Sequence, residues 1–313
     1  MTGTVTRRGL LLSALLLPAC TPAAPPSAAA PPAAPGAPAA SSAPPPPAPV
    51  ALDLSALEGP YAGRIGAWAL DTGTGRTAGH RADERFPLLS TFKALAAGAV
   101  LHRARTAEPG LLDRRLRWTE ADLVTHSPVT GAHVADGLTV AELCAATVGV
   151  SDNTAGNLVL RLLGGPAGLT RYLRTIGDRT SRLDRWETDL NAWTTAERRD
   201  TTTPAAAGRS LAALTTGDAL HPDDRGRLLG WLRAASTGAA RIRAGLPATW
   251  TVGDKTGTAP GFAAANDIAV AHPPAGAPLV LAVYTHRRAP DATPDEAVIA
   301  RTATLLAQAL GRA

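Results

Sequence analysis

A serine and a lysine stand three residues apart in this chain, at Ser90 and Lys93. The Ala- and Leu-rich residues 94–100 follow, and both residue types favour a helix. On a helix, positions i and i+3 lie on one face, so we expect the two side chains to be neighbours. A serine hydroxyl is a poor nucleophile until a base takes its proton, and a desolvated lysine can be that base. Taken alone, the motif is more commonly a serine at a helix start followed by an exposed lysine.

The use of lysine in the chain favours the catalytic interpretation. Lys93 and Lys255 are the only lysines among 31 basic residues, and all the others are arginine. Arginine stays protonated in proteins, whereas a buried lysine can lose its proton, so arginine cannot replace a lysine base. Lys255 belongs to a second polar motif, Asp254-Lys255-Thr256-Gly257. Both lysines are therefore predicted to be functional.

Two further polar motifs lie between these lysines. One is Ser151-Asp152-Asn153, and the other places Glu187 four residues before Asn191. The ordered set Ser-x-x-Lys, Ser-Asp-Asn, Glu-x-x-Leu-Asn and Lys-Thr-Gly resembles the class A serine β-lactamases, in which such motifs carry the chemistry. The resemblance covers most of the chain after residue 50, and it is specific because four motifs occur in the same order.

The resemblance implies a role for each catalytic side chain. Ser90 would attack the amide carbonyl of a β-lactam, and the backbone N–H groups of Ser90 and Thr258 would form the oxyanion hole. Either Lys93, or Glu187 acting through a water, would accept the serine proton, and the sequence does not decide between them. Ser151 would pass a proton to the departing ring nitrogen. The implied reaction is acyl transfer to a serine.

Glu187 and Asn191 would distinguish a hydrolase from a protein that is acylated once and stays acylated. A carboxylate and an amide can hold one water and deprotonate it for attack on the acyl-enzyme ester. Taken alone, Glu187 would more commonly be a solvated loop acid. By resemblance, Arg185 and Asp200 would brace this loop by an ion pair. Thr188 stands where the family often has proline, so a cis bond before it would be costly, and the sequence leaves its conformation open.

The remaining motif residues are expected to bind substrate. The predicted substrate-binding residues are Asn153, Asn191, Lys255, Thr256, Gly257, Thr258 and Arg241. By resemblance, Asn153 would hold the side-chain amide of the substrate, and Lys255 with Thr256 would face its carboxylate. Arg241 matches an arginine that some class A branches use there, with Arg243 as the alternative, and a planar guanidinium suits bidentate carboxylate binding. No cofactor is expected, and no metal site, because the seven histidines show no ligand spacing.

The elements around these motifs predict an α/β (α+β) fold. The predicted strands are residues 64–70, 76–80, 251–258, 266–271 and 279–285, and the predicted terminal helices are residues 52–59 and 294–310. We expect a five-stranded antiparallel sheet flanked by helices, formed by residues 51–82 and 235–313, as in β-lactamases and D,D-peptidases. Residues 83–234 would form an all-helical domain inserted between its halves. The cleft is expected where the two domains meet.

The N-terminal residues predict export. Residues 1–20 combine a twin-arginine pair, an apolar run and Cys20, and they resemble both a twin-arginine signal and a lipoprotein box. Pro18 departs from the small residues usual in that box, so cleavage to a secreted protein is the alternative to a lipid anchor at Cys20. Residues 21–50 hold 12 prolines and no charged residue, which predicts a disordered, semi-extended linker. We expect an extracellular or cell-envelope location.

Cysteine content and charge limit the remaining possibilities. Because Cys20 belongs to the signal, Cys144 is expected to be a lone buried thiol with no internal disulfide. The net charge is +5, and the arginines are scattered among acids, so the chain lacks the basic block of a nucleic-acid-binding protein. A monomer acting on a small molecule is expected.

Two other functions share part of this motif set. A D,D-peptidase or penicillin-binding protein would use the same serine, lysine and Lys-Thr-Gly motif, but it would lack the loop with Glu187 and Asn191. A β-lactam sensor would be acylated but would be expected to lack a working pair for deacylation. We therefore favour hydrolysis of penicillin- or cephalosporin-type antibiotics, with resistance as its consequence. The sequence does not specify which of these substrates is preferred.

Overall fold

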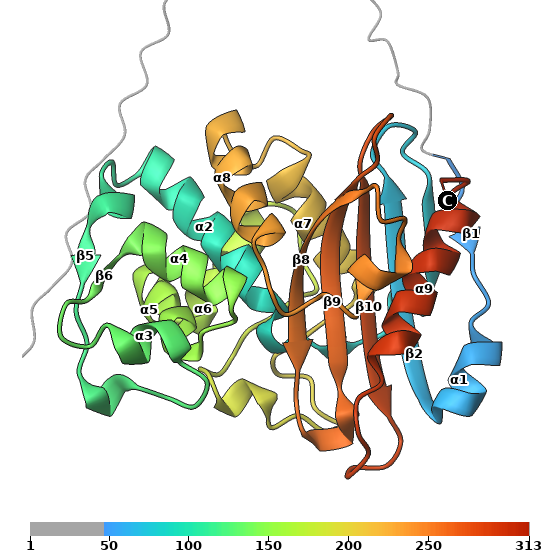
Figure 1. The fold of residues 1–313 in the computed structure, drawn as a ribbon, viewed down its shortest axis with the longest axis horizontal. Coiled ribbons are helices and arrows are strands. Elements are labelled where there is room, and N and C mark those ends of the chain that lie inside the picture. Colours follow the sequence, from blue (N-terminus) through green and yellow to red (C-terminus); the bar gives the residue numbers. More distant parts are fainter. Residues whose placement is uncertain (1–46, 313) are drawn as a thin grey trace, which may run out of the picture. The chain divides into compact units, whose positions relative to one another are not determined.

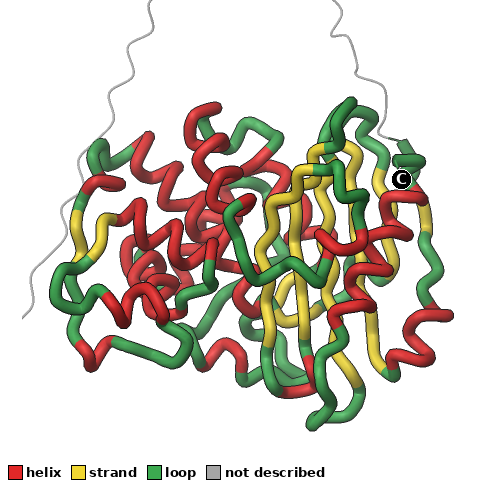
Figure 2. Tube along the Cα trace, viewed as in Figure 1, coloured by secondary structure: helices red, strands yellow, loops and turns green. Residues whose placement is uncertain are grey.

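A computed structural model describes residues 47–312. The predicted export signal with Cys20, and the predicted linker up to residue 46, lie outside the described residues. The described part consists of a β-sheet with helices on both faces and a group of helices beside it (Figure 1 and Figure 2).

The sheet has six strands in the order β1-β3-β2-β10-β9-β8. The strands are β1 (Val50–Ala51), β2 (Gly63–Asp71), β3 (Thr77–His80), β8 (Thr251–Thr258), β9 (Ala265–His272) and β10 (Leu279–Arg287). The five predicted strands are confirmed and pair in antiparallel fashion. The predicted number of strands is wrong, because β1 adds a sixth that pairs in parallel with β3. A two-residue strand has no periodicity that a sequence could reveal.

Seven helices, α2 to α8, form the group beside the sheet (Figure 1). Their bounds are α2 (Phe92–Thr106), α3 (Pro128–Ala132), α4 (Val140–Gly149), α5 (Asn153–Leu163), α6 (Pro166–Thr175), α7 (Pro204–Thr215) and α8 (Pro222–Arg233). The expectation of an all-helical segment needs correction, because two short ladders also occur there. They are β4 (Phe86–Pro87) with β7 (Thr201–Thr202), and β5 (Arg115–Leu116) with β6 (Leu138–Thr139).

Helix α2 is the centre of the helical part. Ten consecutive residues, from Phe92 to Leu101, are buried. A helix that is apolar all round must be covered on every side, and α4, α5, α6, α7 and α8 surround this one. Lys93 lies within this buried segment with an exposed fraction of 0%. The fold therefore removes a lysine side chain from water.

The two faces of the sheet contribute to two separate cores. Successive residues of a strand point to opposite faces. On β2, Trp68 packs in the core shared with α2 and α7, whereas Ala67 and Ala69 pack in the core under α9. The helices on that second face are α1 (Ser55–Tyr61) and α9 (Glu296–Ala309). The alternation fixes which side chains of β8 and β9 face the helical part and which face α9.

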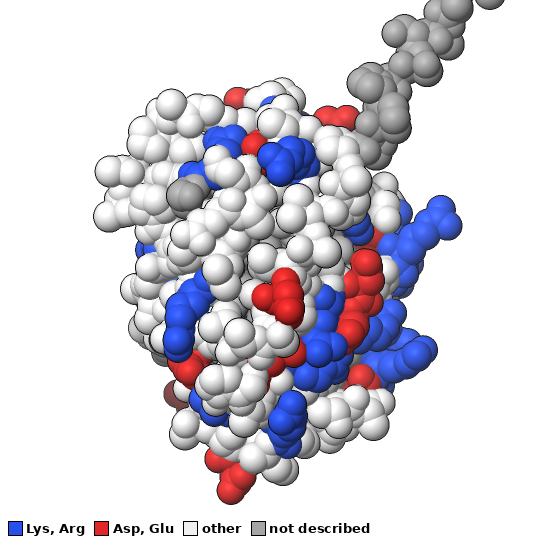
Figure 3. All heavy atoms as spheres, turned by 90° about the vertical axis from the view of Figure 1, so that its right-hand side faces the viewer, with Lys and Arg blue, Asp and Glu red and all other residues white. Residues whose placement is uncertain are grey.

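The surface beside α1 and α9 carries charges of both signs close together (Figure 3). Ion pairs near these helices join Arg312 Nη1 to Asp71 Oδ2 at 2.9 Å and Arg287 Nη2 to Asp295 Oδ2 at 3.7 Å. Between residues 47 and 312, no helix is both long enough and apolar enough to cross a lipid bilayer.

Candidate active site

Ser90 lies in the 3-10 turn Leu89–Thr91, which leads directly into α2. Leu89 has a φ of +50°, a left-handed conformation that residues with a side chain rarely adopt. Such outliers concentrate at functional sites. Gly257 on β8 faces this turn, and a Cβ there would lie only 3.1 Å from the Ser90 nitrogen. The glycine therefore lets the end of β8 lie directly against the serine.

Lys93 is the second residue of α2 and makes several polar contacts. Its Nζ donates to Ser151 O at 2.8 Å and to Asn153 Oδ1 at 2.5 Å, and it lies 3.0 Å from Glu187 Oε1. Burial lowers the pKa of Lys93, and the nearby Glu187 carboxylate offsets this only in part. Ser90 Oγ donates to the same Glu187 Oε1 at 3.2 Å. Ser90 and Lys93, which the sequence predicts to be neighbours, therefore contact the same carboxylate oxygen of Glu187.

Three hydrogen bonds with two asparagines fix the position of Glu187. Its Oε2 accepts a hydrogen bond from Asn191 Nδ2 at 2.8 Å. Asn157 on α5 fixes its backbone, since Asn157 Oδ1 accepts from Glu187 N and Asn157 Nδ2 donates to Glu187 O, both at 2.9 Å. Asn157 was missed by the sequence reasoning, although its position one helical turn after the Ser-Asp-Asn motif was a usable signal. The peptide bond between Glu187 and Thr188 is cis, which answers the question that the sequence left open.

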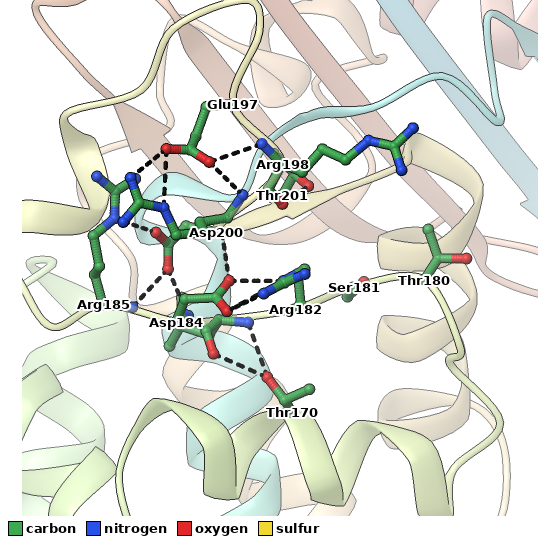
Figure 4. A network of polar contacts seen from close by, with 12 residues as sticks. Thr170, Thr180, Ser181, Arg182, Asp184, Arg185, Glu197, Arg198, Asp200 and Thr201 are labelled. Carbon is green, nitrogen blue, oxygen red and sulfur yellow. Dashed lines mark hydrogen bonds and ion pairs between the residues drawn. The ribbon is translucent and has the colours of Figure 1, made fainter.

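The loop that carries Glu187 is closed at its neck by two aspartates (Figure 4). Asp200 Oδ2 accepts from Arg185 Nε at 2.6 Å, so the predicted ion pair is confirmed. Asp200 Oδ1 accepts from the backbone N–H groups of Asp184 and Arg185 at 2.7 and 2.9 Å. Asp184 Oδ2 in turn accepts from the backbone N–H of Asp200 at 3.0 Å. These bonds tie the two ends of the loop together.

Ser151 lies between the two lysines. Lys255 Nζ donates to Ser151 Oγ at 3.0 Å, and Lys93 Nζ donates to the same oxygen at 3.3 Å. Lys255 is fully buried, and burial together with the charge of Lys93 lowers its pKa well below the ordinary value. Ser151 has a φ of +59°. Asp152 caps the N-terminus of α5, because its Oδ1 accepts a hydrogen bond from Ala155 N at 2.8 Å. The Ser151 hydroxyl thus accepts hydrogen bonds from both lysine side chains.

These groups surround one open cleft. It is lined by Ser90, His126, Ser151, Asn153, Asn191, Thr237, Arg241, Thr256, Gly257 and Thr258. Lys93, Glu187 and Lys255 lie behind this lining, and each contacts a residue that belongs to it. The structure therefore brings all eleven predicted site residues together. His126 also lies in the lining.

Arg241 enters the cleft from the loop that follows α8. It has an exposed fraction of 4%, and its Nη2 donates to Thr258 Oγ1 at 2.6 Å. Its Nε pairs with Glu296 Oε1 at 2.9 Å. The alternative, Arg243, instead directs its guanidinium to Asp254. Of the two arginines, Arg241 is the one that lines the cleft.

Thr237 is a lining residue that the sequence reasoning missed. Its Oγ1 lies 2.7 Å from Thr256 Oγ1, so two hydroxyls meet at the edge of the cleft. It stands four residues before Arg241, but Gly238, Ala239 and Ala240 separate the two, so the local sequence carried no signal for it.

The free thiol found among the described residues does not line the cleft. Cys144 on α4 is a buried free thiol, as predicted, and burial raises its pKa to about 12. Within the part of the chain that the structure describes, no cluster of three or more His, Cys, Asp or Glu side chains could hold a metal ion.

The chain is similar to proteins of one family over nearly all of its described length. The model of the β-lactamase enzyme family matches residues 49–310. The β-lactamase AST-1 of Nocardia asteroides is 54% identical over 82% of both chains. The solved β-lactamase of Streptosporangium roseum is 60% identical, covers 82% of this chain and 97% of its own, and superposes with a TM-score of 0.82. An ancestral class A β-lactamase is 53% identical over 82% of this chain and 98% of its own, with a TM-score of 0.78. These similarities, together with the serine, lysine and glutamate around one cleft, show that the chain belongs to the β-lactamase family, in class A.

Proposed function

We propose that the cleft hydrolyses the amide of β-lactam antibiotics through an acyl-enzyme on Ser90, and that this activity confers β-lactam resistance. The observation that carries the proposal is the position of Glu187. Its carboxylate contacts the nucleophile Ser90, the buried Lys93 and the amide of Asn191. A carboxylate placed beside a nucleophile and an amide can bind one water and deprotonate it for attack on the ester. This arrangement supports release of the acyl group as well as its formation.

Acylation uses the groups around Ser90. The Oγ–C bond forms as the ring C–N bond breaks, and the serine proton passes first to Lys93 or to Glu187. Both bases are compatible with the contacts, since Lys93 Nζ and Ser90 Oγ lie on the same Glu187 oxygen. The lowered pKa of Lys93 favours its neutral form relative to an exposed lysine. The proton ends on the departing ring nitrogen through Ser151, which contacts both lysines.

Deacylation returns the enzyme to its starting state. A water oxygen bonds to the acyl carbon while its proton moves to Glu187, and the ester C–O bond then breaks. Glu187 returns a proton to Ser90 Oγ, which lies 3.2 Å from its Oε1. The backbone N–H groups of Ser90 and Thr258 would bind the oxyanion in both steps, where loss of one such donor typically costs about 3 kcal/mol.

Substrate binding is assigned to the polar lining of the cleft. We assign the substrate carboxylate to Lys255, Thr256 and Arg241, and we add Thr237 because its hydroxyl lies beside that of Thr256. Asn153 is oriented by Lys93 and by Thr125 O, to which its Nδ2 donates at 2.7 Å. We assign Asn153 to the side-chain amide of the substrate.

Hydrolysis of a chromogenic cephalosporin by the purified protein tests this function. The expected result is many turnovers per enzyme molecule, and mass spectrometry should show the acyl group on Ser90 only transiently. Acylation without turnover would instead identify a β-lactam sensor. Cleavage of a D-Ala-D-Ala peptide at a rate comparable to that of the cephalosporin would identify a D,D-peptidase.

We further propose that the protein is exported as a monomer and tethered to the cell envelope through a lipidated Cys20. The proposal is supported by the sequence of residues 1–20 and by the proline-rich stretch up to residue 46. Fractionation of expressing cells tests the tether, with the wild type expected in the membrane fraction and Cys20→Ala expected in the medium. Release of the wild type into the medium would favour the secreted alternative. Sedimentation analysis tests the monomer.

A further inference from the structure

Two aspartates lie buried beneath the loop that carries Thr237 and Arg241. Asp254 on β8 and Asp267 on β9 both have an exposed fraction of 0%. The register of the two strands places Thr256 opposite Asp267. Because residues two apart on a strand share a face, Asp254 is the diagonal neighbour of Asp267 on the same face of the sheet. The two buried side chains therefore share one face of the sheet, and the charge of Asp254 acts on Asp267.

Each of these carboxyl groups has one satisfied oxygen and one unsatisfied oxygen. Asp254 Oδ1 accepts from Arg243 Nε at 3.1 Å, and Asp267 Oδ2 accepts from Ile242 N at 3.0 Å. Asp254 Oδ2 and Asp267 Oδ1 have no hydrogen-bond partner among residues 47–312. A buried acceptor without a partner costs about 1–3 kcal/mol. Two such oxygens in one small region need an explanation.

A proton on one of the two carboxyl groups would account for both unsatisfied oxygens, because the neutral carboxyl could donate a hydrogen bond to the other. Two neighbouring buried carboxyl groups do not both ionise at neutral pH, because the second charge meets the first in a poorly screened environment. A neutral carboxyl can also donate a hydrogen bond, which an ionised one cannot. Burial, followed by the charge of Asp254, raises the pKa of Asp267 well above its usual range. Burial also raises the pKa of Asp254, but the guanidinium of Arg243 opposes this.

We propose that Asp254 and Asp267 share one proton, held on Asp267, and that this pair positions Arg241 for the carboxylate of the substrate. The proposal rests on the proposed function of the cleft. Asp267 accepts a hydrogen bond from the N–H of Ile242, and Asp254 accepts one from the side chain of Arg243. The two residues that follow Arg241 are therefore both bound to the pair. The two aspartates touch no reacting atom and are positioning residues.

The proton on Asp267 also affects the net charge near the cleft residues that are assigned to the substrate carboxylate. The charged groups around the pair are Lys255 on β8, Arg241 and Arg243 on the loop after α8, and Glu296 on α9, which pairs with Arg241. An ionised Asp267 would add a negative charge under Lys255 and Arg241. That charge would compete with the substrate carboxylate for the same cations. A neutral Asp267 leaves the cations available to the substrate.

Infrared spectroscopy of the substrate-free protein tests the proton directly. A protonated carboxyl has a C=O stretching band that an ionised carboxylate lacks. The wild type at pH 7 is expected to show this band, and Asp267→Asn is expected to lack it, whereas Asp189→Asn, on an exposed loop position, should retain it. Residues 1–46 contain no acidic residue, so the N-terminal segment adds no such band. Absence of the band in the wild type, or its loss only in Asp254→Asn, would overturn the assignment.

Kinetics with a chromogenic cephalosporin test the positioning role. In Asp267→Asn, the amide can replace the neutral carboxyl as a donor to Asp254 and as an acceptor from Ile242. In Asp254→Asn, the partner of Arg243 loses its charge, and hydrogen bonds to charged groups contribute about 1.5–3 kcal/mol. We expect KM to rise about tenfold or more in Asp254→Asn, with a smaller change in kcat, and to rise much less in Asp267→Asn. Equal increases in both variants would contradict the proposal.

The two measurements are independent of each other. The infrared band is read without substrate, so it decides the proton assignment even if the cleft proves to be acylated without turnover. If Asp254→Asn fails to fold, the wild type and Asp267→Asn still decide the assignment, because the band must be present in the first and absent from the second.

Discussion

Ser90 Oγ lies 3.2 Å from Glu187 Oε1, and the same oxygen lies 3.0 Å from Lys93 Nζ. One carboxylate oxygen thus joins the nucleophile Ser90 to the buried amine of Lys93. The second oxygen of Glu187 is bound to Asn191. Glu187 is the proposed base for deacylation, whereas Lys93 can still take the Ser90 proton during acylation. Removal of Glu187 should therefore slow deacylation more than acylation.

Glu187→Gln is expected to accumulate acyl-enzyme. The glutamine keeps the size of the side chain but cannot take a proton from water, whereas Lys93 remains available for acylation. Loss of a general base typically lowers the rate by about 10²–10⁴-fold, and we expect a decrease of this order in kcat. Mass spectrometry of the intact protein after mixing with substrate should show a persistent adduct on Ser90.

A matched control is available in the same loop. Asp189 is an exposed acid two residues after Glu187, and Asp189→Asn should leave kcat close to that of the wild type. Rapid turnover of Glu187→Gln without an observable adduct would show that the deacylation assignment is wrong.

Arg185→Ala is expected to loosen the loop that carries Glu187. The substitution leaves the buried carboxylate of Asp200 without its charged partner, which should cost about 1.5–3 kcal/mol. We expect a lower midpoint of thermal unfolding together with slower deacylation. The control is Arg182→Ala, because Arg182 pairs with Asp184 and keeps 45% of its side chain exposed. Exposed pairs contribute less than about 1 kcal/mol, so an equal loss in both variants would contradict the proposed role of the neck.

The features that the sequence predicted best are those encoded in adjacent residues. Strands β2, β3, β8, β9 and β10 were visible because apolar residues alternate along them and turn residues separate them. The catalytic motifs were visible because each keeps its chemistry within a few positions, as in Ser90 with Lys93. The excess of arginine made the two lysines conspicuous. Family resemblance then supplied the roles.

The features that the sequence did not predict depend on contacts between distant segments. Strand β1 is formed only because its two residues lie beside β3. The contact of Thr237 with Thr256, and of Asn157 with the backbone of Glu187, joins residues from separate elements. The paired burial of Asp254 and Asp267 follows from the register of β8 against β9. Apart from the position of Asn157 one helical turn after the Ser-Asp-Asn motif, the local sequence of these segments gives no sign of the contacts.

Cys144 should make the stability of the protein sensitive to alkaline pH. Burial raises the pKa of its thiol from 9.0 to about 12. Below pH 9 the thiol is protonated in both the folded and the unfolded chain, so its full contribution is present. As the pH rises from 9 to 12, the unfolded chain loses this proton and the folded chain keeps it, so the free energy of unfolding should fall by about 1.4 kcal/mol per pH unit.

Denaturant unfolding at several pH values checks this window. The quantity to compare is the difference between the wild type and Cys144→Ala, because Cys20 and the tyrosines are common to both and cancel. The wild type should lose stability relative to the variant above pH 9. A constant difference from pH 8 to pH 11 would contradict the buried, protonated thiol.

Gly208 on α7 should be a position where alanine destabilises the protein, although alanine favours helices. A Cβ at Gly208 would overlap the ring of Trp68 on β2, because α7 packs directly on the sheet. Overpacking of this kind costs about 1–3 kcal/mol, which exceeds the gain of about 1 kcal/mol expected from helix propensity. Gly226 in α8 provides the opposite case, since a Cβ there meets no atom within 4 Å. Thermal unfolding should therefore show a lower midpoint for Gly208→Ala and a higher one for Gly226→Ala, and a shift of the same sign in both would mean that α7 does not approach the sheet as closely as described.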